Sequence, residues 1–271
     1  MRTLVFITLT LLCFPGFALK PQKTYIKTPD SLGLAYESNE ITTTDSFRIK
    51  SWLLFPDEAR DRNTTIIIAG GDAGNMSYYL HQAYFLVKHG YTVVTFDYRG
   101  FGKSSDFEIN EAFLYYTEFA EDLESVIRWA KTKYPENKTG VWALSMGTII
   151  TPITLQKTVL DFYIAEGLVY NPRKLVQRIK ETRNKTVLLP ENTANIASFY
   201  ELIRCPILVF SGTRDQNTIT EESKEVTDMQ PDRKLITFDG GHLRGFQVLS
   251  GRYFGETYIR HINQFVEQIT G

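Results

Sequence analysis

Cysteine is scarce in this chain of 271 residues, where only Cys13 and Cys205 occur. Cys13 lies in an N-terminal segment that we expect to be removed, so a disulfide bond within the remaining chain is excluded. Cys205 precedes Pro206 at the start of an apolar segment, and we expect it to be a small core residue rather than a nucleophile. Stability must therefore come from a hydrophobic core, and a content of 43% hydrophobic residues suffices for one large domain.

A charge excess of either sign is lacking too. The 30 lysines and arginines face 31 aspartates and glutamates, which leaves a net charge of −1. Proteins that bind nucleic acid carry a basic surface, so nucleic acid is not an expected partner. Motifs of metal and nucleotide sites are missing as well: there is no H-E-x-x-H, and "GGDAGN" lacks the lysine and the spacing of a phosphate-binding loop. We therefore expect neither a metal ion nor a cofactor.

Long hydrophobic runs are also lacking. The run over residues 4–14 is shorter than the about 20 apolar residues that cross a bilayer. A single Arg2 precedes this run, Pro15 and Gly16 end it, and small residues lie at positions 16 and 18. The pattern predicts a signal peptide over residues 1–18, cleaved after Ala18, and an exported protein that is secreted or periplasmic. An uncleaved membrane anchor is the alternative interpretation.

What is present is a regular alternation of short apolar segments and helical patterns. Strands are predicted at residues 41–44, 47–55, 65–69, 92–97, 140–144, 162–166, 207–211 and 234–238. Helices are predicted at residues 76–89, 111–134, 146–158, 221–229 and 251–269. Apolar strands separated by helices are typical of a mostly parallel sheet that helices cover on both faces. The sequence thus predicts a single α/β domain over residues 19–271 with eight strands.

Residues 170–204 interrupt the alternation with two short helical patterns between two strands. We expect this segment to be a small cap over the C-terminal edge of the strands, where open α/β sheets bind ligands. Residues 173–185 hold six basic residues against one acid, Glu181, which is a local charge of +5. Such a cluster could attract anionic substrates or make a peripheral contact with anionic lipid, and a solvated helix face is the alternative.

Chemically reactive residues follow several of the predicted strands. "ALSMG" places Ser145 after one strand, "SGTRD" places Asp215 after another, and "DGGH" places His242 after the last. The intervals are 70 residues (215 − 145) and 27 residues (242 − 215). Because the C-terminal ends of parallel strands share one edge of the sheet, these three side chains should converge. A serine, an acid and a histidine in this order are typical of an acyl-transfer triad.

The sequence resembles the α/β-hydrolase-fold serine hydrolases, in particular the branch of serine aminopeptidase-like and monoacylglycerol-lipase-like proteins. The matching blocks are "GGDAGN", "FDYRGFGKSS", "ALSMG", "GTRD" and "GGH", from about Leu32 to the C-terminus. The resemblance implies the α/β-hydrolase fold. Two positions depart from the family pattern: Ala143 replaces the first glycine of G-x-S-x-G, and Gly70 stands where many relatives carry histidine.

Each triad residue has an expected role. Ser145 is the expected nucleophile, and His242 is the base that takes its proton and returns it to the leaving group. Asp215 orients the imidazole and stabilises the imidazolium, although Glu166, which also follows a strand, remains an alternative acid. The backbone N–H of Met146, just after the nucleophile, is one expected oxyanion donor. The resemblance implies that the N–H of Asp72 is the other.

Other polar residues receive less specific interpretations. His81, His89 and His261 fall within predicted helices and are expected to be surface or core residues. Asp97 and Arg99 follow a strand and are expected to organise a tight loop. The predicted function is a secreted serine hydrolase that cleaves carboxylic esters, or thioesters, of a small acyl substrate. A serine peptidase such as an aminopeptidase is the alternative within the fold, and a catalytically silent binding protein is the alternative outside enzymes.

Overall fold

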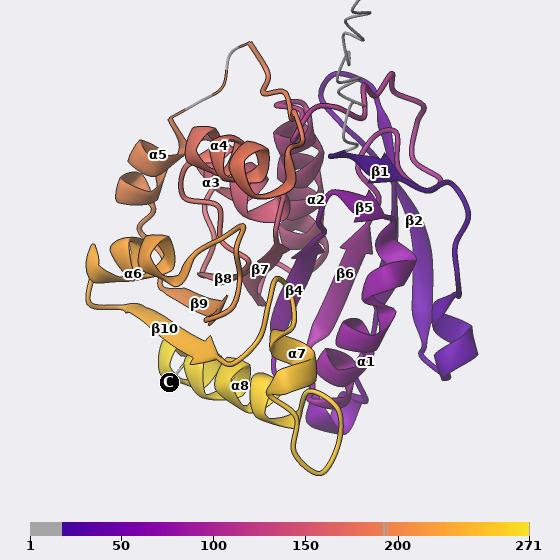
Figure 1. Cartoon of the computed structure of the whole chain (residues 1–271). Helices are drawn as coiled ribbons and strands as arrows, with labels where there is room; N and C mark the ends of the chain where they lie inside the picture. The colour runs from indigo at the N-terminus through magenta and orange to yellow at the C-terminus, as the bar shows by residue number, and fades with distance from the viewer. Residues whose placement is uncertain (1–17, 192, 194, 271) are drawn as a thin grey trace, which may run out of the picture.

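A computed structural model of the chain describes residues 18–191, 193 and 195–270 (Figure 1). The predicted signal peptide therefore lies outside the described residues, except for Ala18. The centre is an eight-stranded sheet in the order β10-β9-β8-β7-β4-β6-β3-β2. Its strands are β2 (Tyr36–Thr42), β3 (Arg48–Leu54), β4 (Thr64–Ala69), β6 (Thr92–Phe96), β7 (Lys138–Leu144), β8 (Phe162–Glu166), β9 (Ile207–Gly212) and β10 (Arg233–Phe238). The pairings of β3 with β2 and β6 are antiparallel, and the others in this sheet are parallel.

Helices cover both faces of the sheet. They are α1 (Leu80–Lys88), α2 (Phe119–Lys133), α3 (Gly147–Thr154), α4 (Pro172–Arg183), α5 (Ile196–Leu202), α6 (Thr220–Asp228), α7 (Gly245–Val248) and α8 (Glu256–Thr270). Three 3₁₀ turns occupy Pro29–Leu32, Glu58–Arg60 and Met76–Tyr79, and a second small sheet pairs β1 (Lys20–Pro21) with β5 (Ala73–Gly74). The predicted fold class is confirmed. None of the helices in the described part of the chain is long and apolar enough to cross a membrane.

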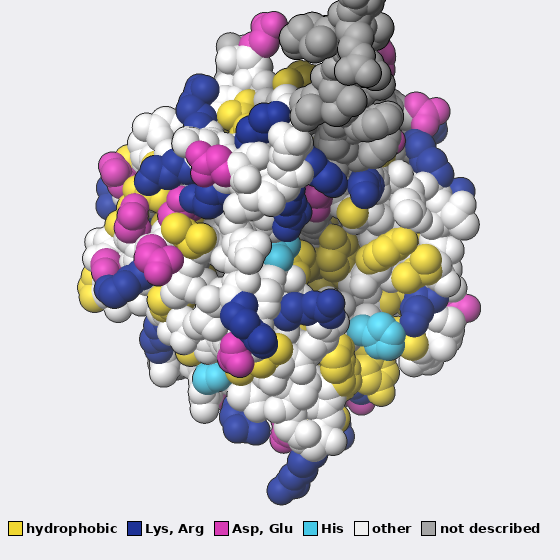
Figure 2. Space-filling view, viewed as in Figure 1, with side chains coloured by type: hydrophobic (Ala, Val, Ile, Leu, Met, Phe, Trp, Pro, Cys, Tyr) yellow, Lys and Arg dark blue, Asp and Glu magenta, His cyan; other side chains and the backbone are white. Residues whose placement is uncertain are grey.

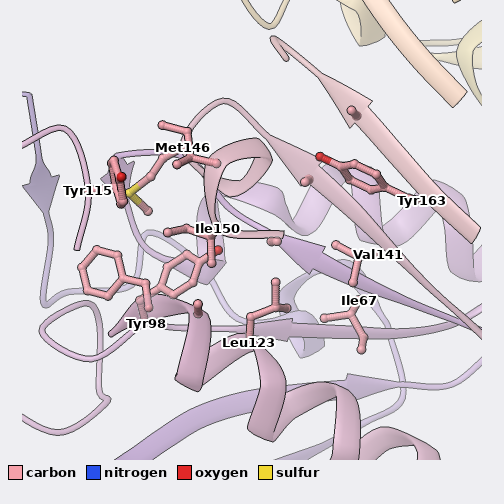
Figure 3. Close-up of a cluster of buried hydrophobic side chains, with 14 of the residues drawn as sticks. Ile67, Tyr98, Tyr115, Leu123, Val141, Met146, Ile150 and Tyr163 are labelled. Carbon is pink, nitrogen blue, oxygen red and sulfur yellow. The ribbon is translucent and has the colours of Figure 1, made fainter. Parts of the chain in front are cut away.

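The central strands are buried on both faces, which explains their near-continuous apolar sequences. Because side chains alternate along a strand, neighbouring residues enter opposite cores. Figure 3 shows one core, in which Ile67 of β4 and Val141 of β7 lie with Leu123 of α2. Ile66 and Trp142, one residue away, belong to the other core, under α1 and α8.

Two predicted helix starts were wrong by five residues or more, and the helix predicted to end at residue 158 ends at Thr154. The helix expected from residue 111 begins at Phe119, because the preceding residues hydrogen-bond to the chain after α4 instead. The Leu114 N–H donates to the Leu188 carbonyl, and the Leu188 N–H donates to that of Ala112, both at 2.8 Å. The helix expected from residue 251 begins at Glu256, and the one-turn helix α7 was not predicted.

The inserted segment between β8 and β9 forms the two helices α4 and α5. Asn171 caps α4, since its side chain accepts hydrogen bonds from the N–H groups of Arg173 and Lys174. The Arg178 guanidinium pairs with Glu222 of α6 at 2.6 Å and donates to the Asn217 carbonyl at 2.9 Å. The cap is thereby attached to the loop after β9, which carries Asp215.

Candidate active site

Ser145 occupies a sharp turn between β7 and α3. Its φ of +50° lies in the left-handed region, which is unfavourable for a serine and typical of a nucleophile elbow. Gly147 is required there, since a Cβ at this position would lie 2.3 Å from the Ala69 carbonyl oxygen. Ala143 lies fully buried within β7, where it is opposite Ala69 and Ala165 of the neighbouring strands. The alanine at the first motif position is therefore accommodated without positive φ.

A chain of hydrogen bonds joins the three residues of the predicted triad. The Nε2 atom of His242 lies 2.9 Å from the Ser145 Oγ, and its Nδ1 lies 2.7 Å from Oδ2 of Asp215. With the proton on Nδ1, the imidazole donates to the carboxylate and accepts from the serine hydroxyl. The three residues come from loops after β7, β9 and β10, so the sheet edge brings them together as the sequence predicted.

The carboxylate of Asp215 is further held by its own loop. It accepts hydrogen bonds from the Asn217 N–H at 2.8 Å and from the Thr218 N–H and hydroxyl at 3.1 and 2.6 Å. Burial by itself raises the pKa of this carboxyl, but the hydrogen bond and charge of His242, together with those donors, outweigh burial and lower the pKa below its usual value. Asp215 therefore remains ionised at neutral pH, as a partner for an imidazolium must be.

Glu166, the alternative acid, has a different environment. Its Oε1 accepts the Gly245 N–H at 2.7 Å, so the carboxylate binds the backbone of the loop that follows His242. The residue is 2% exposed, and burial raises its pKa to about 7. The carboxylate that contacts the His242 Nδ1 is that of Asp215, not that of Glu166.

Of the two predicted oxyanion donors, Met146 directly follows Ser145 in the chain and Asp72 lines the cavity that contains the serine. Met146 directly precedes α3, at the positive end of that helix. Asp72 lines the same cavity as Ser145 and His242. The neighbouring Gly71 packs against the elbow, because a Cβ on Gly71 would lie 3.6 Å from the Ser145 Cβ. The Gly71 N–H donates to the Tyr79 hydroxyl at 2.7 Å, which holds this loop in place.

The segment after Ala18 also supports this loop, which sequence reasoning missed. Strand β1 pairs in parallel with β5, and the Lys20 N–H donates to the Asp72 carbonyl at 2.8 Å. The Asn75 side chain donates to the carbonyls of Gln22 and Thr24 at 2.9 and 2.8 Å. Leu19 is completely buried in the core. A strand of two residues is too short to show a periodic pattern, so the sequence could not predict it.

Asp97, Arg99 and Cys205 lie outside the triad. The buried Asp97 accepts from the Tyr25 hydroxyl and the Met76 N–H, both at 2.7 Å, and Arg99 pairs with Asp122 at 2.6 Å. These bonds organise the loop after β6. Burial raises the pKa of the Cys205 thiol to about 12, so this residue is a poor nucleophile at neutral pH.

The remaining histidines contact residues outside the triad. His81 lies 3.2 Å from the Lys27 ammonium, and His89 lies 3.2 Å from the Tyr253 hydroxyl. His261 packs edge-on against the Phe210 ring.

A cavity of about 180 Å³ contains Ser145 and His242 in its lining, together with residues of the cap. It is lined by Ala18, Asp72, Leu114, Ser145, Leu175, Ile179, Arg183, Lys185, Val187, Asn217, Thr218 and His242. A larger cavity of about 360 Å³, near Thr44, Glu118 and Lys157, contains none of the triad residues. The smaller cavity is therefore the candidate substrate site.

Comparison with known proteins agrees with this architecture. Residues 60–172 match the family model for serine aminopeptidase S33, a span that includes Ser145 but ends before Asp215 and His242. The esterase Pf2001 of Pyrococcus furiosus superposes with a TM-score of 0.75 at 26% identity, over 93% of this chain and all of the esterase chain (100%). The chain has the α/β-hydrolase fold. This hydrolase fold has esterases and peptidases among its solved relatives.

Two further relatives of this α/β hydrolase are informative. The uncharacterized protein YfhR of Escherichia coli O157:H7 is 25% identical over 240 residues, which covers 83% of this chain and 80% of YfhR. An acylaminoacyl peptidase shares the fold with a TM-score of 0.64 at 15% identity, over 88% of this chain and 41% of that one. At that identity the similarity concerns the fold alone.

Proposed function

We propose that this α/β hydrolase is an exported serine esterase that cleaves carboxylic esters of small acyl groups through an acyl-enzyme. The observation that carries the proposal is the continuous hydrogen-bond chain from Ser145 through His242 to Asp215. The esterase Pf2001, similar over nearly the whole chain, supports an ester rather than a peptide substrate.

In the proposed acylation step, the Ser145 Oγ attacks the carbonyl carbon of the ester while the His242 Nε2 takes the hydroxyl proton. The carbonyl oxygen becomes an oxyanion, which the N–H groups of Met146 and Asp72 stabilise. When the tetrahedral intermediate collapses, the bond to the leaving alcohol breaks and the imidazolium donates its proton to that alcohol. The ionised Asp215 stabilises the imidazolium between these two proton transfers.

Deacylation repeats these steps with water. His242 removes a proton from water, the hydroxide attacks the acyl-enzyme, and the acid product leaves as Ser145 regains its proton. The left-handed φ of Ser145 supports this role, because it presents the Oγ to the cavity at the edge of the sheet. Thioesters follow the same course with a thiol leaving group.

The proposal is tested by labelling the purified protein with a fluorophosphonate and locating the adduct by mass spectrometry. We expect the adduct on Ser145, and we expect Ser145→Ala to abolish labelling and lower ester turnover by about four to six orders of magnitude. Cys205→Ala is the matched control and should keep nearly full activity. Faster cleavage of aminoacyl amides than of esters would assign the protein to the peptidases, and ester turnover by Ser145→Ala at the wild-type rate would refute the mechanism.

A further inference from the structure

Two basic side chains of the cap, those of Arg183 and Lys185, line the cavity that contains Ser145 and His242. Arg183 ends α4, and Lys185 follows two residues later. Both residues are exposed, and neither side chain forms an ion pair or a hydrogen bond with another residue in the described part of the chain. Figure 2 shows several Lys and Arg side chains close together in the upper middle of one face, above exposed hydrophobic side chains.

The other basic residues of the cap are engaged or lie elsewhere. Arg178 forms a two-pronged pair with Glu222, with distances of 2.6 and 2.9 Å, and Glu222 is 2% exposed. The Lys180 ammonium lies near the Asn184 and Thr186 side chains. The sequence predicted a cluster of six basic residues. Of these, Arg183 and Lys185 are the two that line the cavity, and neither is paired with an acid in the described part of the chain.

One carboxylate opposes this pair. Asp72 lines the same cavity, and burial raises its pKa, while the charges of His242, Lys20 and Arg183 act in the opposite direction. With Asp72 ionised, the two cations still exceed its single negative charge. Among the residues that line the cavity, His242 apart, the charges therefore sum to +1, and this positive excess attracts anions.

Apolar side chains also line this cavity. They are those of Leu114, Leu175, Ile179 and Val187, which line it together with Ser145 and His242. Its volume of about 180 Å³ is small, since pockets for drug-sized ligands measure roughly 300–1,000 Å³. A short hydrocarbon segment fits such a wall, and a charged end would then meet the cations of the cap.

We propose that the preferred substrates are small esters that carry a carboxylate or a similar anionic group, and that Arg183 and Lys185 bind this group. The inference rests on the proposed esterase function and adds the substrate class. Because the cations contact a part of the substrate that does not react, they strengthen ground-state and transition-state binding equally, so they lower KM and leave kcat unchanged.

The test compares matched esters with purified enzyme in a pH-stat. Monoethyl adipate carries the anion in its acyl part, the butyrate ester of glycolic acid carries it in the leaving group, and ethyl hexanoate and ethyl butyrate are the neutral controls. We expect Arg183→Gln and Lys185→Gln each to raise KM about 2- to 5-fold for one of the anionic esters, with kcat unchanged. The neutral esters should be unaffected, and the loss should shrink as salt rises from low to high concentration.

Two further variants serve as controls for the comparison of anionic with neutral esters. Lys174→Gln removes an exposed charge from the same helix outside the cavity, and we expect no change on any ester. Asp72→Asn keeps the backbone N–H but removes the opposing carboxylate, so the ratio of kcat/KM for the anionic over the neutral ester should rise.

Several outcomes would overturn the proposal. One is an equal loss on anionic and neutral esters, and another is a wild-type preference for the neutral ones. A third is binding to vesicles of anionic phospholipid that Arg183→Gln and Lys185→Gln abolish while the soluble esters are unaffected, because the cations would then serve a membrane surface. Failure of the esterase function itself is distinguishable, since wild-type protein would then neither react with fluorophosphonate nor cleave any of the esters.

Discussion

Glu166 and Gly245 are joined by a hydrogen bond of 2.7 Å, in which the Gly245 N–H donates to the Glu166 carboxylate. The carboxylate of Asp215 instead contacts the imidazole of His242, at 2.7 Å from Nδ1. Two carboxylates thus support one histidine differently: Asp215 binds its ring, and Glu166 holds the backbone three residues later. We therefore expect substitutions of Asp215 and Glu166 to differ in their effect on turnover.

We expect Asp215→Asn to lower kcat for ester hydrolysis by roughly 10³- to 10⁴-fold, because an amide favours the wrong imidazole tautomer. Glu166→Gln keeps an acceptor for the Gly245 N–H and should cost less than about tenfold. Steady-state kinetics of both variants on one ester make the comparison, with far-UV circular dichroism to show that both remain folded. A larger loss in Glu166→Gln would transfer the acid role to Glu166.

Burial of Glu166 should make stability depend on pH. The pKa rises from 4.5 to about 7 on folding, so the folded protein binds this proton more tightly than the unfolded chain. The associated stability is complete below pH 4.5 and is lost as pH rises through about 7, in total roughly 3 kcal/mol. Asp215, whose pKa is lowered, loses its contribution only at more acidic pH and does not interfere.

Urea denaturation between about pH 5 and 8.5 measures this effect. The free energy of unfolding of the wild type should fall with rising pH relative to that of Glu166→Gln, which cannot titrate. A difference between the two proteins that stays constant across this range would contradict the prediction.

The nucleophile elbow should tolerate a substitution at Ala143 but not at Gly147. Gly147→Ala places a Cβ 2.3 Å from the Ala69 carbonyl oxygen, a backbone atom that cannot move aside cheaply. We expect that variant to lose at least about tenfold in kcat/KM, or about 2 kcal/mol or more of stability, because the serine turn is displaced. Ala143→Gly should retain most activity. Equal kinetics and equal melting temperatures for the two variants would show that the close approach is unimportant.

The segment after the predicted cleavage site should contribute to the rate. A chain that begins at Leu19 keeps β1 and the Lys20 bond to Asp72, whereas a chain that begins at Thr24 loses both. We expect the shorter chain to show at least about a tenfold lower kcat with little change in KM, since a loosened donor weakens transition-state binding. Kinetics of the two chains test this, provided that both are folded by circular dichroism. Similar kcat values would leave β1 with a merely structural role.

Several features of the fold follow from local sequence patterns. The main-sheet strands β4, β6, β7, β8 and β9 are mostly apolar because both of their faces are buried, and β8 has the predicted bounds of Phe162–Glu166. The convergence of Ser145, Asp215 and His242 follows from the same logic. Residues that directly follow parallel strands share one sheet edge, however far apart they lie in the chain.

Other features depend on partners distant in sequence. Residues 111–118 have helical periodicity, yet they bind Leu188 across the cap and form no helix before Phe119. Glu166 is the last residue of β8, at the sheet edge where the triad residues lie, and only the position of Gly245 shows that its carboxylate binds the backbone.

The basic residues of the cap show most clearly what the sequence determines and what only the tertiary structure decides. The sequence by itself determined that residues 173–185 are basic and that their helix lies between two strands at the ligand-binding edge. The tertiary structure decided which charges are available, because Glu222 on α6 neutralises Arg178, while Arg183 and Lys185 reach the cavity. The physical reason is that a charge is neutralised by what lies within a few ångströms in space, and periodicity along one helix carries no information about the surface of another.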